Sequence, residues 1–126
     1  MENLYININS ELVYYPIVDF NAQSGICEIS GESYMEETYQ FYEPVIVWLQ
    51  NFMAEKKPIV LNIRLTYFNT SSSRFILEIL YTLKKYINSG GMATVNWYYK
   101  NDDPDILTEI NDFIEESGIK INIISL

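Results

Sequence analysis

Hydrophobic positions in the first quarter of the chain follow a strand-like pattern. Residues 3–8, 12–20 and 26–30 alternate or cluster β-forming side chains, and residues 23–25 are typical of a turn between the last two segments. This pattern predicts an N-terminal hairpin or meander. Gly31 follows the third segment, and we expect that strand to end there.

The period of the pattern changes after residue 35. Apolar positions now recur every three or four residues, which predicts an amphipathic helix that closes before Pro58. Glu36 and Glu37 are expected in its first turn, where the positive end of the helix dipole favours carboxylates. A nearly continuous apolar run over 59–68 then predicts a central strand that is covered on both faces of the sheet.

Helix and strand patterns alternate through the rest of the chain. They predict a helix with its apolar stripe at 75–87, a strand at 92–99, a helix from Pro104 to a stop at Gly118, and a last strand at 119–126. The whole order is β-β-β-α-β-α-β-α-β, and its second half consists of βαβ units. Right-handed crossovers then pack about three helices on a mixed sheet, so we expect a single α/β domain over residues 1–126.

Composition and charge narrow the classes of function. The 126 residues are 48% hydrophobic and 20% charged, which is the profile of one compact domain. Eight Lys and Arg against seventeen Asp and Glu give a net charge of −9, which repels nucleic-acid phosphates and anionic lipids. No apolar run in the sequence approaches the roughly 20 residues of a membrane span. We therefore expect neither nucleic-acid binding nor membrane insertion.

The chain has no His and a single Cys, which limits its chemistry. Without His, neither a Ser-His nor a Cys-His nucleophile pair is available, and the commonest metal ligand is missing. Cys27 cannot form an intramolecular disulfide, and between Ile26 and Ile29 it is typical of a small buried hydrophobe. We expect a cytoplasmic protein, in a reducing compartment, that uses no metal or cofactor.

Two segments are weak candidates for a site. The stretch from Asp102 to Glu116 holds seven carboxylates, but no EF-hand spacing fits it, and a solvated helix face explains it more simply. Trp97, Tyr98 and Tyr99 resemble a stacking platform for single-stranded nucleic acid, but the negative charge argues against this. Strand alternation places Trp97 and Tyr99 on one face and Tyr98 on the other, which favours a role in the core and its rim over a partner surface.

The third candidate is the polar segment Asn69-Thr70-Ser71-Ser72-Ser73-Arg74, which joins the predicted central strand to the next helix. The first N–H groups of a helix lack partners within the helix, so Asn69 or Thr70 can cap them, and capping alone explains this composition. Alternatively, one hydroxyl receives a phosphate, because helix N-termini accept anions and Arg74 can pair the charge. The residues alone leave both interpretations open.

This segment carries a family resemblance. The run LTYFNTSSS at 65–73, followed by Arg74, resembles the signature of the SiaC family of bacterial regulatory phosphoproteins. GESY at 31–34 and NWYY at 96–99, the latter followed by acids, are also similar to segments of that family, and order and spacing agree over nearly the whole chain. The departures from the family pattern lie at Tyr15-Pro16, Met35 and Glu37 and concern the rim rather than the phosphoacceptor.

The resemblance implies a STAS-like fold, akin to anti-sigma-factor antagonists, and a role in partner switching. In the family, a dedicated protein kinase phosphorylates the Thr of Asn-Thr-Ser-Ser, and a metal-dependent serine/threonine phosphatase removes the phosphate. The unmodified protein binds and activates a diguanylate cyclase, which raises cyclic di-GMP and favours biofilm formation or aggregation. Carried over to this sequence, the phosphoacceptor is Thr70, and the residues framing the partner contact are Asn69, Ser71, Ser72, Ser73 and Arg74.

Two other classes of function stay open at this point. A STAS-like module could bind a small ligand such as a nucleotide or lipid, or act as an anti-sigma-antagonist-type interaction module, without phosphorylation. An enzyme could pair acids such as Glu32, Glu36 and Glu37, but no nucleophile or metal set accompanies them, and a solvated helix start explains them. We expect a non-enzymatic regulator in which the face around Thr70 and the adjacent acidic helix dock the partner.

Overall fold

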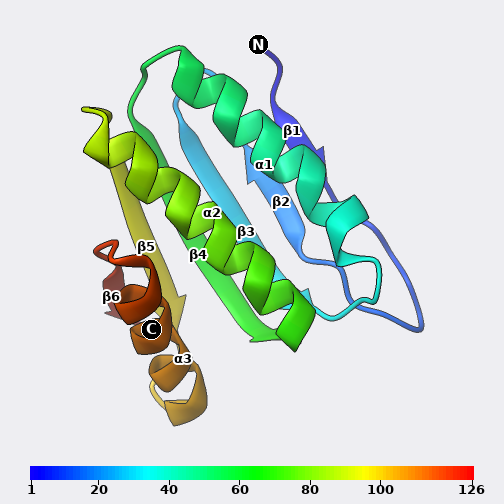
Figure 1. Ribbon diagram of the computed structural model, residues 1–126. Helices are drawn as coiled ribbons and strands as arrows, with labels where there is room; N and C mark the ends of the chain where they lie inside the picture. The colour runs from blue at the N-terminus through cyan, green and yellow to red at the C-terminus, as the bar shows by residue number, and fades with distance from the viewer.

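The computed structural model describes residues 1–126 and shows two layers, a six-stranded sheet and three helices packed on it (Figure 1). The elements are β1 (Leu4–Ile6), β2 (Ile17–Phe20), β3 (Ile26–Ser33), α1 (Thr38–Ala54), β4 (Ile59–Phe68), α2 (Thr70–Asn88), β5 (Ala93–Tyr99), α3 (Pro104–Ser117) and β6 (Asn122–Ser125). The predicted α/β class and element order are confirmed. None of the helices is long and apolar enough to cross a bilayer.

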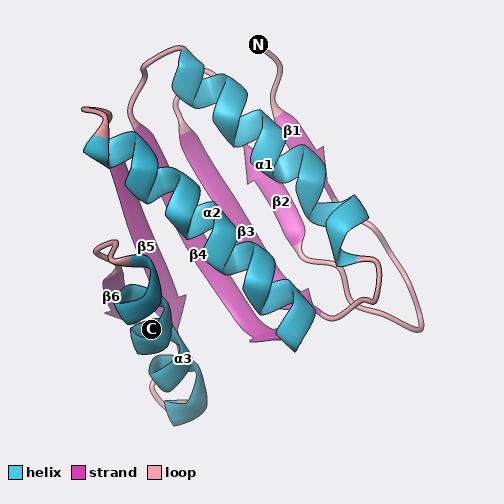
Figure 2. Ribbon diagram, in the orientation of Figure 1, coloured by secondary structure: helices cyan, strands magenta, loops and turns pink.

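The strands lie in the sheet in the order of the sequence, from β1 to β6. The β1–β2 and β2–β3 pairs are antiparallel, and the three pairs from β3 to β6 are parallel. Each parallel crossover therefore steps in the same direction along the sheet. Because such crossovers are right-handed, all three helices fall on one face, as Figure 2 shows.

The sheet is consequently covered on one side only, and the expectation that the central strand is covered on both faces was wrong. In β4, Leu61, Ile63 and Leu65 are buried against the helices, whereas the residues between them are only half-buried. The apolar run was interpreted as a strand covered on both faces, but Asn62 and Arg64, which alternate with its buried residues, lie on an open face. The hydrophobic core lies between the sheet and the three helices.

The open face of the sheet is lined by polar side chains that bind one another. Arg64 donates to Glu28 at 2.7 Å, and its guanidinium lies 3.9 Å from the ring centroid of Tyr98. A row of side-chain amides crosses three strands, with hydrogen bonds of 3.0 and 2.9 Å that link Asn62, Asn96 and Asn122. These contacts occupy the polar groups at the centre of this face.

Several strand boundaries differ from the prediction. The third strand does not end at Gly31 but continues to Ser33, because Gly31 adopts a positive φ of 97° and stays paired with β4. The predicted strand over 12–20 is shortened to β2, and only Tyr14 before it pairs, with Tyr34. The last strand is likewise reduced from 119–126 to β6.

The predicted capping residues of α3 are confirmed, but the acids predicted in the first turn of α1 are not. Asp103 caps α3 by accepting the N–H of Ile106 at 3.2 Å, and Gly118 ends that helix with a left-handed φ of 71°. Glu36 and Glu37 lie before α1 rather than in its first turn, which contains no acid, so this expectation was wrong.

The burial of Trp97, predicted from strand alternation, and of Cys27, predicted from its apolar neighbours, is confirmed. Trp97 is fully buried and stacks on Phe113, whereas Tyr98 lies on the open face. Cys27 is also fully buried, and burial, followed by the charge of Asp19, raises the pKa of its thiol to about 12. Cys27 is therefore an inert core side chain.

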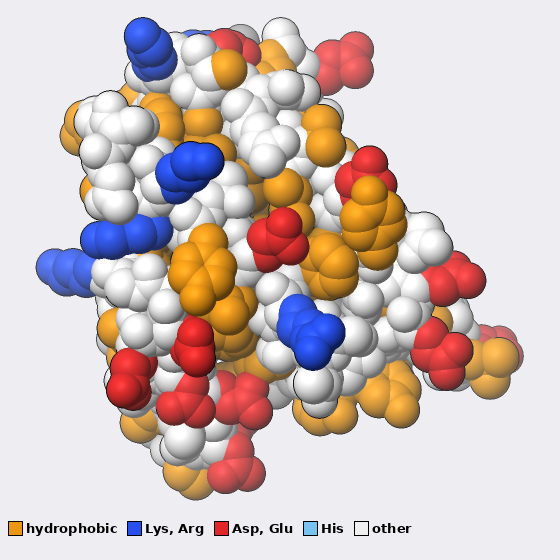
Figure 3. Space-filling view, viewed as in Figure 1, with side chains coloured by type: hydrophobic (Ala, Val, Ile, Leu, Met, Phe, Trp, Pro, Cys, Tyr) orange, Lys and Arg blue, Asp and Glu red, His pale blue; other side chains and the backbone are white.

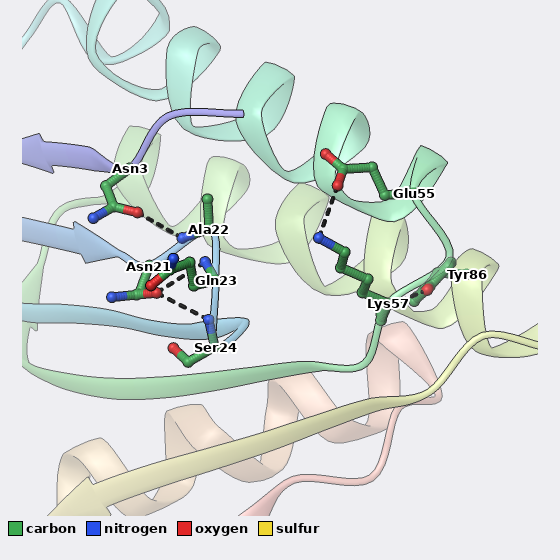
Figure 4. A network of polar contacts seen from close by, with 8 residues as sticks. All are labelled: Asn3, Asn21, Ala22, Gln23, Ser24, Glu55, Lys57 and Tyr86. Carbon is green, nitrogen blue, oxygen red and sulfur yellow. Dashed lines mark hydrogen bonds and ion pairs between the residues drawn. The ribbon is translucent and has the colours of Figure 1, made fainter.

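Close polar contacts fasten the end of the molecule at which the parallel strands begin (Figure 4). The Asn21 side chain accepts the N–H groups of Gln23 and Ser24 at 2.9 Å each, which closes the turn between β2 and β3. Across the same end, Tyr86 of α2 donates to the Lys57 carbonyl at 2.7 Å.

Candidate functional site

The candidate site lies at the opposite end of the sheet, where β4 passes into α2. The register between β3 and β4 shifts by one residue after Gly31, so that Thr66 has no partner in β3. This β-bulge reverses the alternation of the strand. Tyr67 therefore points outward and is 50% exposed, whereas Phe68 enters the core, although the sequence pattern had counted Tyr67 among the apolar residues of the covered strand.

Thr70 is the first residue of α2, and its side chain is exposed. Asn69 is the N-cap, and its side-chain oxygen accepts the N–H of Ser72 at 2.9 Å. The helix therefore does not need the Thr70 hydroxyl as a cap, and this hydroxyl forms no hydrogen bond within the protein. Capping is therefore the role of Asn69 and leaves the Thr70 hydroxyl unengaged.

The three serines that follow Thr70 are all engaged. The Ser71 hydroxyl donates to the Asn69 side chain at 3.3 Å, and the Ser73 hydroxyl donates to the Thr70 carbonyl at 2.8 Å. Ser72 is fully buried. Of the four hydroxyls in this turn, only that of Thr70 is both exposed and free.

Ser72 belongs to a buried chain of polar groups beneath the site. The Tyr42 hydroxyl lies 2.7 Å from that of Ser33, Ser33 donates to Ser72 at 2.8 Å, and Ser72 donates to the Met35 sulfur at 3.7 Å. Burial raises the pKa of Tyr42 to about 12, so its hydroxyl stays protonated. Because Ser72 cannot touch a docked protein from this position, its role is to hold α2 against β3 and α1.

Arg74 follows Thr70 by one helical turn, is exposed, and forms no ion pair. It lines a groove of about 360 Å³ between α2 and α3 with three carboxylates, those of Glu109, Asp112 and Glu116. Partial burial, then the charges of Asp112, Asp105 and Asp103, raise the pKa of Glu109. The acidic helix thus lies beside the start of α2. No group of His, Cys, Asp or Glu side chains in the structure is arranged to hold a metal ion.

Exposed apolar side chains gather on the other side of Asn69, and Figure 3 shows such side chains along the lower edge of the molecule. Leu12 is 89% exposed and lines a hollow of about 450 Å³ together with Tyr34 and Asn69. The Tyr34 ring centroid lies 6.0 Å from that of Tyr67. We call Leu12, Tyr14, Tyr34 and Tyr67 the apolar rim. Sequence reasoning missed it, because the bulge that exposes Tyr67 depends on pairing between distant strands.

Comparisons with known proteins assign the chain to a family. A sequence model described as "SiaC family regulatory phosphoprotein" matches residues 9–126. The chain belongs to the SiaC family. The family resemblance read from 65–73 is therefore confirmed.

Relatives in Pseudomonas aeruginosa support the assignment to the SiaC family. The uncharacterized protein PA14_02130 of strain UCBPP-PA14 is 29% identical over 102 residues, which cover 80% of this chain and 81% of that protein. SiaC of Pseudomonas aeruginosa superposes over 100% of both chains with a TM-score of 0.89 and 27% identity. A crystal structure of the diguanylate cyclase SiaD in complex with its activator SiaC matches with a TM-score of 0.90 and 27% identity, over 98% of this chain and 99% of the other.

Proposed function

We propose that this SiaC family member is a non-enzymatic regulator that binds and activates a diguanylate cyclase, and that phosphorylation of Thr70 prevents the binding. The observation that carries the proposal is the Thr70 hydroxyl, which is exposed and free while its three neighbours are engaged. The complex of SiaD with its activator SiaC supports the choice of partner. In this proposal the unmodified chain raises cyclic di-GMP in the cytoplasm, which favours biofilm formation or aggregation.

The fold can carry a phosphate at this position. Phosphorylation adds about −1.5 to −2 charges and three acceptor oxygens. Negative charge at the N-terminus of a helix is favourable by about 0.3–1 kcal/mol. Arg74 lies one turn further along α2 and forms no ion pair in the structure. Side chains at this spacing on a helix can reach one another, so Arg74 can pair with the phosphate. The modified protein therefore stays folded, and only its docking surface changes.

Docking, in contrast, should be sensitive to the phosphate. Arg74 neutralises only part of the dianion, so burying the phosphate in a protein contact still costs several kcal/mol, and every 1.4 kcal/mol is about tenfold in affinity. One phosphate on Thr70 can thus weaken binding by roughly a hundredfold or more. Reversal requires two further partners, which we propose to be a dedicated protein kinase and a metal-dependent serine/threonine phosphatase.

Side-chain exposure decides which of the neighbouring residues are proposed to contact the partner. Asn69, Ser71, Ser73 and Arg74 are exposed or half-buried around Thr70 and remain in the proposed contact. Ser72 is left out because it is fully buried. For the same reason we propose Thr70 rather than Ser72 as the residue that the kinase modifies.

The test compares Thr70→Ala and Thr70→Asp in calorimetric binding to the purified cyclase of the source organism. We expect the Ala variant to bind within about threefold of wild type and the Asp variant to lose about tenfold or more, although Asp carries only about half of a phosphate's charge. Thr94→Asp, which adds the same charge at an exposed position of β5 near the other end, is the matched control and should bind normally. Unchanged binding of Thr70→Asp would count against the switch.

Mass spectrometry of the protein from its own cells tests the modification itself. A phosphate on the peptide that spans Thr70 supports the proposal. A phosphate on Ser71 or Ser73 alone contradicts the choice of acceptor. A noncovalently bound small molecule in the native spectrum, with no phosphate, would instead favour a STAS-like ligand-binding module.

A further inference from the structure

We propose that the apolar rim, defined above as Leu12, Tyr14, Tyr34 and Tyr67, is the surface on which the cyclase docks, and that it receives an apolar segment flanked by Lys or Arg. This inference rests on the proposed function and specifies where the partner lies and what its contact segment contains. It adds an apolar surface to the polar contact proposed around Thr70, a surface that was not expected from the sequence.

The rim is a connected surface rather than a set of scattered side chains. Tyr14 and Tyr34 pair as neighbouring strand residues through backbone hydrogen bonds of 2.9 and 2.8 Å, so their side chains lie on the same face. The Tyr34 and Tyr67 rings lie 6.0 Å apart, and Leu12 lines the same hollow as Tyr34. Apolar and aromatic surface of this kind is typical of the energetically dominant part of a protein interface.

The bulge in β4 explains why these side chains are exposed at this end. If Thr66 were paired, the alternation of the strand would turn Tyr67 into the core. Instead, Tyr67 lies outside, and Asn69, the residue before Thr70, lines the same hollow as Leu12 and Tyr34, so a partner that fills this hollow also reaches the corner of the fold that carries Thr70. The centre of the open sheet face offers no comparable surface, because the Arg64 cluster and the amide row already occupy it.

The charge around the rim indicates the chemistry of the occupant. Glu36 and Glu37 line the hollow with Leu12 and Tyr34, Glu11 precedes Leu12, and no Lys or Arg lines the hollow. A segment with basic flanks therefore complements both this surface and the net charge of −9. An acidic segment would be repelled from the same surface.

The effect of the phosphate is consistent with a basic occupant. Phosphorylation changes the net charge only from −9 to about −11, so long-range attraction to Lys and Arg is nearly unaltered. At contact, a hydrated dianion on Thr70, next to the Asn69 that lines the hollow, keeps the partner from closing on the apolar rim and excluding water there. The phosphate therefore acts by short-range desolvation and bulk.

The experiment measures the affinity of full-length variants for the purified cyclase by calorimetry. We expect Tyr34→Ser and Tyr67→Ser each to weaken binding by about tenfold or more, and Leu12→Ser, in an exposed loop whose change leaves the core intact, by about threefold to tenfold. Tyr81→Ser is the matched control, because Tyr81 is also 46% exposed but lies on α2 near α3, and it should bind within about twofold. Thermal unfolding verifies that each variant is folded.

The outcomes separate this inference from the proposed function. If Tyr34→Ser, Tyr67→Ser and Leu12→Ser all bind like wild type while Thr70→Asp does not, the docking surface is wrong and the switch stands. If the chain phosphorylated on Thr70 binds normally, the switch is wrong whatever the rim variants do.

Hydrogen exchange of the cyclase tests the chemistry of the occupant. The segment that the unmodified chain protects should contain apolar side chains with Lys or Arg at its ends, and protection of an acidic segment overturns the inference. Sedimentation of the chain alone provides a further check. A dimer that Tyr67→Ser dissociates would assign the rim to a second copy of this chain and overturn the inference as well.

Discussion

The two ends of the sheet differ in how their surfaces are used. At the end where the parallel strands begin, side chains and backbone close on one another, as the contacts of Asn21 and Tyr86 show. At the carboxyl end, the Thr70 hydroxyl is free and the apolar rim is uncovered. Loops beyond the carboxyl ends of parallel strands are where sites gather in α/β sheets. The contacts of Asn21 and Tyr86 thus join segments at one end, whereas the other end leaves a hydroxyl and an apolar surface exposed.

The charge of the two ends differs as well. Figure 3 shows Lys and Arg side chains mainly toward the upper left of that view, where α2 ends, and acids over α3 and along the right edge. Lys84 and Lys85 lie near the C-terminus of α2, where cations complement the helix dipole. Lys84 and Lys85 thus complement the C-terminal end of α2, while the end that carries Thr70 keeps an excess of carboxylates.

The largest expected loss of stability comes from adding a side chain at Gly25, at the end where the parallel strands begin. This residue has a φ of 74°, and an added Cβ would lie 2.3 Å from the carbonyl oxygen of Pro58. We expect Gly25→Ala to lower the free energy of unfolding by about 3 kcal/mol or more in urea titrations. Gly90→Ala is the control, because Gly90 has a φ of 101° but open space, and it should lose about 1–2 kcal/mol. Equal losses would show that backbone conformation, not the close approach, sets the cost.

The next effect concerns the support beneath the site. Ser72→Ala removes the acceptor that Ser33 uses at 2.8 Å, and we expect a loss of about 1–3 kcal/mol in the free energy of unfolding. Ser73→Ala, which removes a hydroxyl bonded only to its own helix, should change it by less than about 0.5 kcal/mol. Urea unfolding of both variants tests the difference. If Ser73→Ala proved the costlier change, Ser72 would not be the serine that holds the corner.

The stability of the protein at alkaline pH tests the burial of Cys27, near the end where the parallel strands begin. Folding raises the pKa of Cys27 from 9.0 to about 12, so the native state binds more protons than the unfolded state in that interval. The stability contributed by Cys27 is complete below pH 9 and falls as the pH rises, by up to about 1.4 kcal/mol per pH unit. We expect Cys27→Ala to show a shallower decline in urea unfolding between about pH 8 and 10.5, with the Tyr42 contribution remaining. An unchanged slope would exclude the thiol as its source.

The smallest expected loss of stability concerns Arg74 in the chain phosphorylated on Thr70. With phosphothreonine at position 70, Arg74→Gln should lower the free energy of unfolding by about 0.3–1 kcal/mol and raise the second pKa of the phosphate in ³¹P NMR titrations. The same substitution in the unmodified chain should have almost no effect, since Arg74 forms no ion pair there. Arg74→Lys should restore most of the phosphate pKa shift. If the phosphate titrates alike in all three proteins, Arg74 does not hold it.

The element order and the caps could be predicted from the sequence because they depend on local interactions. The helical period ahead of Pro58, Asn69 at the start of α2, and the pair of Asp103 and Gly118 around α3 all act within a few residues. The position of Thr70 at a strand-to-helix corner follows from the same signals. Its identification as a phosphoacceptor came from the family resemblance and not from periodicity.

The exposure of individual side chains could not be predicted in this way. Whether β4 is covered on one face or two depends on the direction in which successive crossovers step along the sheet. Whether Tyr67 faces inward depends on its register with β3, a strand more than thirty residues away in the sequence. Ser72 and Thr70 have similar hydroxyls in one turn, and only packing against Ser33 and Tyr42 separates the buried one from the free one.

The amino-acid sequence by itself determined the α/β order and the helix caps, because short-range periodicity and capping carry that information. Composition set the acidic charge, and the family resemblance pointed to Thr70 as the candidate phosphoacceptor. Tertiary structure alone decided that Thr70 is free while Ser72 is buried, that one face of the sheet is open, and that Tyr34 and Tyr67 form an apolar surface at the end where β4 passes into α2. The physical reason is that strand register and helix placement arise from contacts between segments far apart in the chain, and these contacts choose which side chains meet solvent.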